Sequence, residues 1–131
     1  MSSVTHVSDI GWDFYYSGGE LPVIPNCGKW MYFFEPANLD FADKVVQEAV
    51  SMGVCVEAKH TNKSVLQAAQ SGVCCFYCDG MNVVSMKSII SFFFEHNMIE
   101  RSNTGKLMPI ILEIYIILTV TFLWICQLSF Q

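Results

Sequence analysis

The adjacent residues Lys59 and His60 carry the side chains in this sequence that are best suited to acid–base or phosphate chemistry. An imidazole can exchange a proton near neutral pH, and a lysine can bind an anion or, when desolvated, abstract a proton. Both residues end a predicted strand and precede the polar Thr61 and Asn62, and the loops at strand ends commonly hold ligands. Lys59 and His60 are therefore the candidate catalytic residues. The alternative is a solvated strand end, because no spacing in the sequence fixes a partner carboxylate.

Trp12 and Trp30 are the candidate ligand-binding residues, because a flat indole face can stack on a base or a cation. For Trp30 the competing interpretation is a buried core residue, since it stands inside an apolar and aromatic run.

Three cysteines, Cys74, Cys75 and Cys78, stand close together, and the last two have the C-x-x-C spacing. A structural zinc site would need a second pair of ligands, and the sequence has no second C-x-x-C and no H-x-x-x-H. A thioredoxin-type pair would need its first cysteine at a helix N-terminus, whereas these residues lie within a predicted strand. Alternation along a strand also sends Cys75 and Cys78 to opposite faces. We therefore expect core thiols, no metal site and no cofactor.

The composition is that of one folded domain. The 131 residues are 53% hydrophobic and 15% charged, which excludes a disordered chain. The formal net charge is −5, and the basic residues form no stripe, so broad binding to nucleic acid is not expected. The N-terminus lacks a basic region followed by an apolar stretch, so we expect no signal peptide and a cytoplasmic location.

Two hydrophobic periods alternate along the middle of the chain. Short apolar runs bounded by turn formers predict buried strands, and apolar residues recurring at three and four predict amphipathic helices. The predicted strands are residues 29–34, 54–59 and 73–78, and the predicted helices are residues 38–53 and 83–97.

This order, β-α-β-β-α, predicts an α+β fold with a mixed or antiparallel sheet and two amphipathic helices packed on one face. Residues 63–71 could form a short helix or a mobile insert. The core domain is expected to span residues 28–106, preceded by an aromatic N-terminal arm, residues 1–27, rich in proline and glycine.

An apolar C-terminal tail, residues 107–131, differs from the rest of the chain. Between Met108 and Phe130 the only charge is Glu113. The run is long enough to cross a bilayer, but it has no flanking basic cluster. Three interpretations stay open: a pair of core strands, a membrane segment, or a frameshifted end that replaces the usual strands.

The motif Gly28-Lys29-Trp30 and the strand end Ala58-Lys59 resemble features of two related groups, the cap-binding translation initiation factors and the phosphothreonine lyase domain family. The resemblance covers residues 26–106 and implies the initiation-factor-like fold. Phosphothreonine elimination would use a lysine as base and a histidine as acid, for which Lys59 and His60 are the adjacent candidates. Neighbouring residues on an extended chain point apart, however, which argues against one catalytic pair. The aromatic pair and acidic residue that cap binding needs cannot be placed in this sequence.

We therefore expect a small binding or accessory domain of undetermined ligand, with a phage or mobile element as its expected source. The first alternative is a phosphate-handling, phosphothreonine lyase-like enzyme. The second is a single-span membrane protein anchored by its tail. The sequence contains no phosphate-binding loop, nucleophile elbow, zinc-protease motif or dinucleotide fingerprint.

Overall fold

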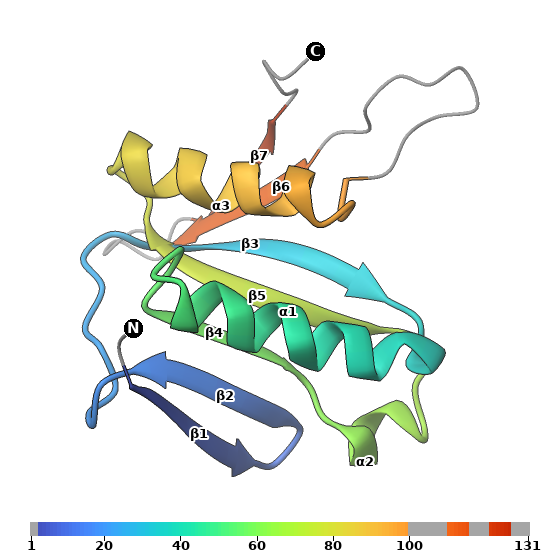
Figure 1. Ribbon diagram of the computed structural model, residues 1–131. Helices are drawn as coiled ribbons and strands as arrows, with labels where there is room; N and C mark the ends of the chain where they lie inside the picture. Colours follow the sequence, from blue (N-terminus) through green and yellow to red (C-terminus); the bar gives the residue numbers. More distant parts are fainter. Residues whose placement is uncertain (1–2, 100–109, 116–120, 127–131) are drawn as a thin grey trace.

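The computed structural model describes residues 3–99, 110–115 and 121–126, which form one antiparallel sheet with helices on it (Figure 1). The strands follow the order β1-β2-β4-β5-β3-β6-β7 across the sheet. The predicted α+β class is confirmed. The elements are β1 (Val4–Asp9), β2 (Trp12–Ser17), β3 (Cys27–Phe34), a 3-10 turn (Pro36–Asn38), α1 (Leu39–Ser51), β4 (Glu57–Thr61), α2 (Lys63–Leu66), β5 (Gly72–Asp79), α3 (Val83–Glu95), β6 (Ile110–Tyr115) and β7 (Thr121–Cys126).

The long helices α1 and α3 lie on the same face of the sheet (Figure 1). Helix α1 buries an apolar stripe, as its period of three and four predicts, and Gly53 ends the helical segment with a positive φ of 75°. Asn82 caps the N-terminus of α3, where its side chain accepts a hydrogen bond from the Ser85 amide at 3.1 Å. The buried residues of α1 are Ala42, Val45, Val46, Ala49 and Val50.

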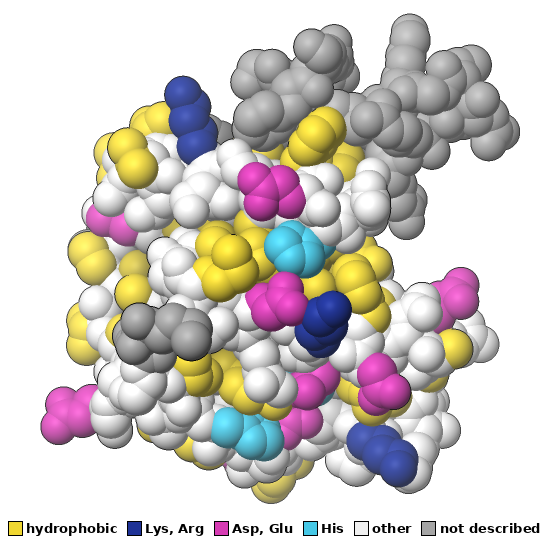
Figure 2. All heavy atoms as spheres, viewed as in Figure 1, with side chains coloured by type: hydrophobic (Ala, Val, Ile, Leu, Met, Phe, Trp, Pro, Cys, Tyr) yellow, Lys and Arg dark blue, Asp and Glu magenta, His cyan; other side chains and the backbone are white. Residues whose placement is uncertain are grey.

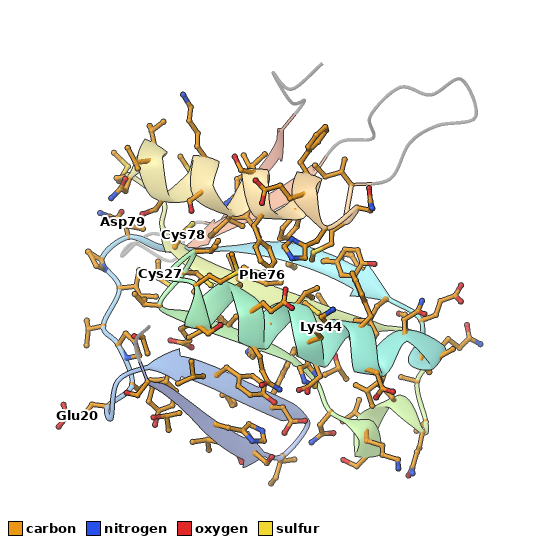
Figure 3. All side chains as sticks on the ribbon, in the orientation of Figure 1. Glu20, Cys27, Lys44, Phe76, Cys78 and Asp79 are labelled. Atoms are coloured by element: carbon orange, nitrogen blue, oxygen red, sulfur yellow. The ribbon has the colours of Figure 1, made fainter. Side chains whose placement is uncertain are left out.

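The core lies between this helix pair and the central strands. Phe76 of β5 is fully buried and packs edge-on against Phe93 of α3, with ring centroids 5.0 Å apart (Figure 3). A hydrogen bond of 3.0 Å between His96 Nε2 and Glu48 Oε2 joins the two helices above this core. Burial of the aromatic side chains thus holds both helices on one face of the sheet.

The N-terminal segment, predicted as an aromatic arm, contains a β-hairpin that joins the sheet. Strands β1 and β2 pair through a turn at Gly11, which has a φ of 86°, and β2 then pairs with β4. The hairpin therefore widens the sheet by two strands that the sequence analysis did not predict.

Strand β4 starts and ends later than predicted. It begins at Glu57 instead of Val54 and includes both His60 and Thr61, so Lys59 and His60 lie within the strand and not at its end. The segment after it contains the short helix α2, which was one of the two predicted possibilities.

The apolar tail contributes strands β6 and β7, and β6 pairs with β3 through Gly28, Lys29 and Trp30. Both strands belong to the main sheet, as the interpretation of the tail as core strands implies. Among the described residues, no helix has the length and apolar character needed to cross a membrane. Met108 and Phe130, the ends of the predicted membrane segment, lie outside the described residues.

Candidate functional site

Lys59 and His60 project from opposite faces of the sheet. His60 is only 2% exposed and points toward α1, where its Nε2 lies 2.9 Å from Asp43 Oδ1. Lys59 lies on the face away from the two long helices, which we call the far face, because neighbouring residues of a strand alternate. The predicted pair is thus not brought together, and the one active site that would use both residues is absent from this structure.

The structure instead brings Lys59 together with Trp12. The Lys59 Nζ lies 3.9 Å from the centroid of the Trp12 ring, and 5.4 Å and 5.7 Å from the rings of Phe14 and Tyr77. This arrangement follows from the strand register, which pairs Phe14 with Lys59 across β2 and β4. A cation over aromatic faces is attracted to their π-electrons. We call Lys59, Trp12, Phe14 and Tyr77 the lysine–aromatic cluster.

The ammonium group of Lys59 is half-buried. Within residues 3–99, no carboxylate lies within ion-pair distance of its Nζ. Burial lowers the pKa of Lys59, and the nearby positive charge of Lys29 lowers it further. Cys75 and, to a smaller extent, Glu57 oppose this shift, and burial raises the pKa of Glu57 itself. The cluster is therefore a site where an incoming anion would be stabilised.

A shallow pocket of about 250 Å³ adjoins the cluster, with Trp12 as a shared wall. Its lining is mainly apolar and includes Phe33, whose side chain is 57% exposed. The Thr61 hydroxyl in this pocket already accepts a hydrogen bond of 2.9 Å from the Val73 amide. An apolar group could lie here beside an anion at Lys59.

On the helix side, His60 belongs to a network that sequence reasoning missed. Asp43 Oδ1 accepts a hydrogen bond of 2.6 Å from the Tyr15 hydroxyl, and Asp43 Oδ2 accepts one of 2.8 Å from Gln47 Nε2. His60 Nδ1 faces the carbonyl oxygen of Thr61 at 2.8 Å, and because a carbonyl only accepts, Nδ1 carries a hydrogen. No motif signals this network, because its members come from β2, β4 and α1.

Hydrogen bonds decide the ionisation of Asp43. Burial raises its pKa, but the hydrogen bonds from Tyr15, His60 and Gln47 outweigh burial and leave the pKa below the usual value of 3.8. Burial also raises the pKa of Tyr15, and its hydrogen bond to Asp43 raises it further. The network is thus held by a carboxylate that stays ionised at neutral pH.

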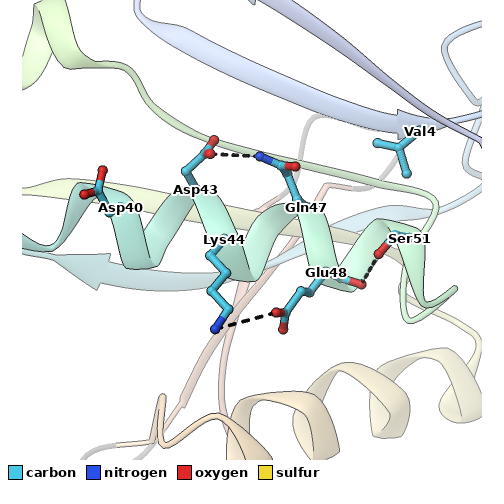
Figure 4. Close-up of a pocket in the computed structure, with 7 residues that line it drawn as sticks. All are labelled: Val4, Asp40, Asp43, Lys44, Gln47, Glu48 and Ser51. Carbon is cyan, nitrogen blue, oxygen red and sulfur yellow. Dashed lines mark hydrogen bonds and ion pairs between the residues drawn. The ribbon is translucent and has the colours of Figure 1, made fainter.

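A polar pocket of about 500 Å³ follows α1 beside this network (Figure 4). Asp40, Asp43 and Glu48 supply its negative charge, and Lys44 reaches Glu48 at 3.9 Å. Figure 2 shows the helix side of the molecule, where basic side chains are few and lie among acidic ones. Of the candidate catalytic residues, only His60 lies on this side of the sheet. It is buried beneath the network and does not line the pocket.

A second cluster, Ser8, His6 and Asp13, has the residue types of a hydrolytic triad but not its geometry. His6 Nε2 faces Asp13 at 3.0 Å and also Ser8 at 3.5 Å. A triad needs the acid and the nucleophile on different ring nitrogens. This exposed cluster is therefore a hydrogen-bonded group on the β1–β2 hairpin and not a catalytic triad.

Trp30 lies in the core, with 1% of its surface exposed. It offers a ligand no accessible ring face, and the core interpretation of this residue fits the structure. Of the two candidate tryptophans, only Trp12 lies at a surface where a ligand could reach it.

Cys74, Cys75 and Cys78 are buried, as expected of core thiols, and Cys55 is buried with them. Burial raises the pKa of the Cys55 and Cys78 thiols to about 12 and holds that of Cys74 well above its usual value. Cys75 and Cys78 lie on opposite faces of β5, and among the described residues no group of histidine, cysteine or acidic side chains could hold a metal ion. Because Cys75 and Cys78 point to opposite faces, they lack the geometry of a redox-active C-x-x-C pair.

Comparisons with protein-family models, with curated proteins and with solved structures find no match to this chain. The resemblance to the cap-binding initiation factors and the phosphothreonine lyase domain family therefore stays a prediction.

Proposed function

We propose that this protein is a small binding domain, and that its ligand is an anion with an attached apolar group, held on the far face at Lys59 and Trp12. The observation that carries the proposal is the position of the Lys59 ammonium group, 3.9 Å from the Trp12 ring and without a carboxylate partner within residues 3–99. A half-buried cation gains more from a ligand anion than a solvated one, because less water has to be displaced.

The second half of the argument is the pocket beside Trp12. Its lining includes Phe33, Val65 and Val73, so it would accept an apolar group but not a second charge. A ligand that extends from this pocket across Trp12 would place its apolar group in the pocket and its anion at Lys59. The phosphate-handling alternative is less well supported, because His60 is buried on the opposite face.

The fluorescent aromatic anion 8-anilinonaphthalene-1-sulfonate is a suitable probe, because it combines a sulfonate with apolar rings. Lys59→Met keeps most of the apolar stem and removes the charge. We therefore expect the dissociation constant of the probe to rise about tenfold, a loss of about 1.4 kcal/mol of binding free energy. Trp12→Ala should weaken binding by a similar factor. Lys63→Met is the matched control, since Lys63 is an exposed lysine outside the cluster.

Two further comparisons make the test specific. The uncharged analogue N-phenyl-1-naphthylamine should bind equally to the original chain and to Lys59→Met, because only the sulfonate contacts the cation. Equal sulfonate affinity for the original chain and Lys59→Met, with the fold preserved in circular dichroism, would exclude this site.

A further inference from the structure

Strand β1 forms one edge of the sheet, and among the described residues no strand pairs with the backbone groups of its outer side. The Gly18 amide donates to the Ser3 carbonyl at 3.0 Å, and the Ser17 amide donates away from β1, to the Val56 carbonyl at 2.9 Å. In an antiparallel pair every second residue directs its backbone N–H and C=O toward the partner strand, so Thr5 and Val7 direct theirs toward β2. The outward backbone groups of β1 therefore belong to Val4, His6 and Ser8.

This edge lacks the lysine, proline and bulge that commonly protect an edge strand; its charged residue is Asp9, at the end of β1. Proteins block such edges with lysine, proline, a bulge or a covering segment. Strand β1, with the sequence VTHVSD, contains neither lysine nor proline, and its pairing with β2 is continuous from Val4 to Asp9. In the part of the chain that the structure describes, no strand pairs with its outer side.

We infer that the chain forms a two-fold symmetric dimer by antiparallel pairing of β1 with β1 of a second copy, centred on His6. In this register His6 of one copy faces His6 of the other. Val4 of each copy faces Ser8 of the other copy. Every outward residue then meets an outward residue, and the three pairs can exchange about six hydrogen bonds. A second copy of β1 can therefore satisfy every outward backbone group of the strand, and the side chains decide whether it also fits.

The side chains are compatible with this register. Between the hydrogen-bonded pairs, Thr5 would lie opposite Val7, a β-branched pair of the kind that stabilises sheets. His6 is already held within its own subunit, with its ring stacked on Tyr15 at 4.5 Å between centroids. The two His6 rings therefore need not enter the contact between the copies, and the two sheets would become one continuous sheet.

Sedimentation equilibrium of the full chain over a range of concentrations tests the dimer. We expect a reversible rise toward twice the chain mass, abolished by His6→Pro, because proline removes an outward amide without removing a bond to β2. His6→Ala is the matched control: it loses the same side chain but keeps the amide, and it should still dimerise. A chain that stays monomeric, or a dimer that His6→Pro leaves intact, would overturn the inference.

Disulfide trapping tests the register, and it keeps the inference testable if His6→Pro fails to fold. Two facing residues of a hydrogen-bonded pair have Cα atoms about 5.5 Å apart, within the range of a disulfide. His6→Cys should therefore form a covalent dimer under mild oxidation, above the background of the unsubstituted chain. Ser8→Cys should not form a covalent dimer, because residue 8 of each copy lies opposite Val4 of the other copy and not opposite residue 8. Trapping of Ser8→Cys but not of His6→Cys would overturn this register.

Discussion

Asp43 of α1 and His60 of β4 are 2.9 Å apart, and the same carboxylate oxygen accepts the hydroxyl of Tyr15 from β2. One side chain of the helix therefore holds two neighbouring strands of the sheet. These two hydrogen bonds join the β1–β2 hairpin and β4 to α1, while the pairing of β2 with β4 places Trp12 beside Lys59. The polar network on the helix side and the lysine–aromatic cluster on the far face thus share strands β2 and β4.

The acid sensitivity of the fold should depend on Asp43. Its folded-state pKa lies below 3.8, so its contribution to the free energy of unfolding is present above the unfolded-state value and is lost as the pH falls through the folded-state value. Asp43→Asn should therefore flatten the acid side of the stability curve, and at neutral pH it should cost about 1 to 3 kcal/mol through lost hydrogen bonds to a charged group.

Urea unfolding at a series of pH values would measure this effect. Asp40→Asn is the control, because Asp40 is an exposed acid on the same helix. If both variants have the same pH dependence as the original chain, Asp43 is not the group that stabilises the hairpin.

Gly72 should not tolerate a side chain. A Cβ atom at this position would lie 2.5 Å from the Phe34 ring and 2.9 Å from the Leu66 side chain, both of which are buried. Overpacking of this kind costs about 1 to 3 kcal/mol, so Gly72→Ala should lower the denaturant midpoint and the melting temperature. Gly19→Ala meets nothing within 4 Å and serves as the control. An unchanged midpoint for Gly72→Ala would mean that β5 does not approach α2 this closely.

The core thiols should resist alkylation until the chain unfolds. Burial raises the pKa of Cys55 and Cys78 to about 12, so few thiolates form at pH values near 8. Cys27 lies at the same end of the sheet as Cys78 (Figure 3) but is only half-buried, so it should react with iodoacetamide before Cys55 and Cys78. Peptide mass spectrometry, with and without urea, would give the order of labelling. Rapid native labelling of Cys78 would contradict the packing of β5.

The central elements could be predicted because each carries its own hydrophobic period. Residues 38–53 repeat at three and four, and residues 73–78 form an apolar run between glycine-containing turns, so each is recognisable without knowledge of its neighbours. The hairpin could not be predicted in the same way. Trp12, Phe14, Tyr15 and Tyr16 are all aromatic, which hides the alternation of two that would identify β2 as a strand.

The sequence by itself determined local features: the two long helices, the central strands and the buried cysteines. It also determined that Lys59 and His60, as neighbours in an extended strand, point to opposite faces. Which partners they meet was decided by the tertiary structure. Trp12 lies 47 positions before Lys59, and they meet only because β2 pairs with β4 in one particular register. Such a register is set by the packing of whole faces against α1, and no short stretch of sequence contains that information.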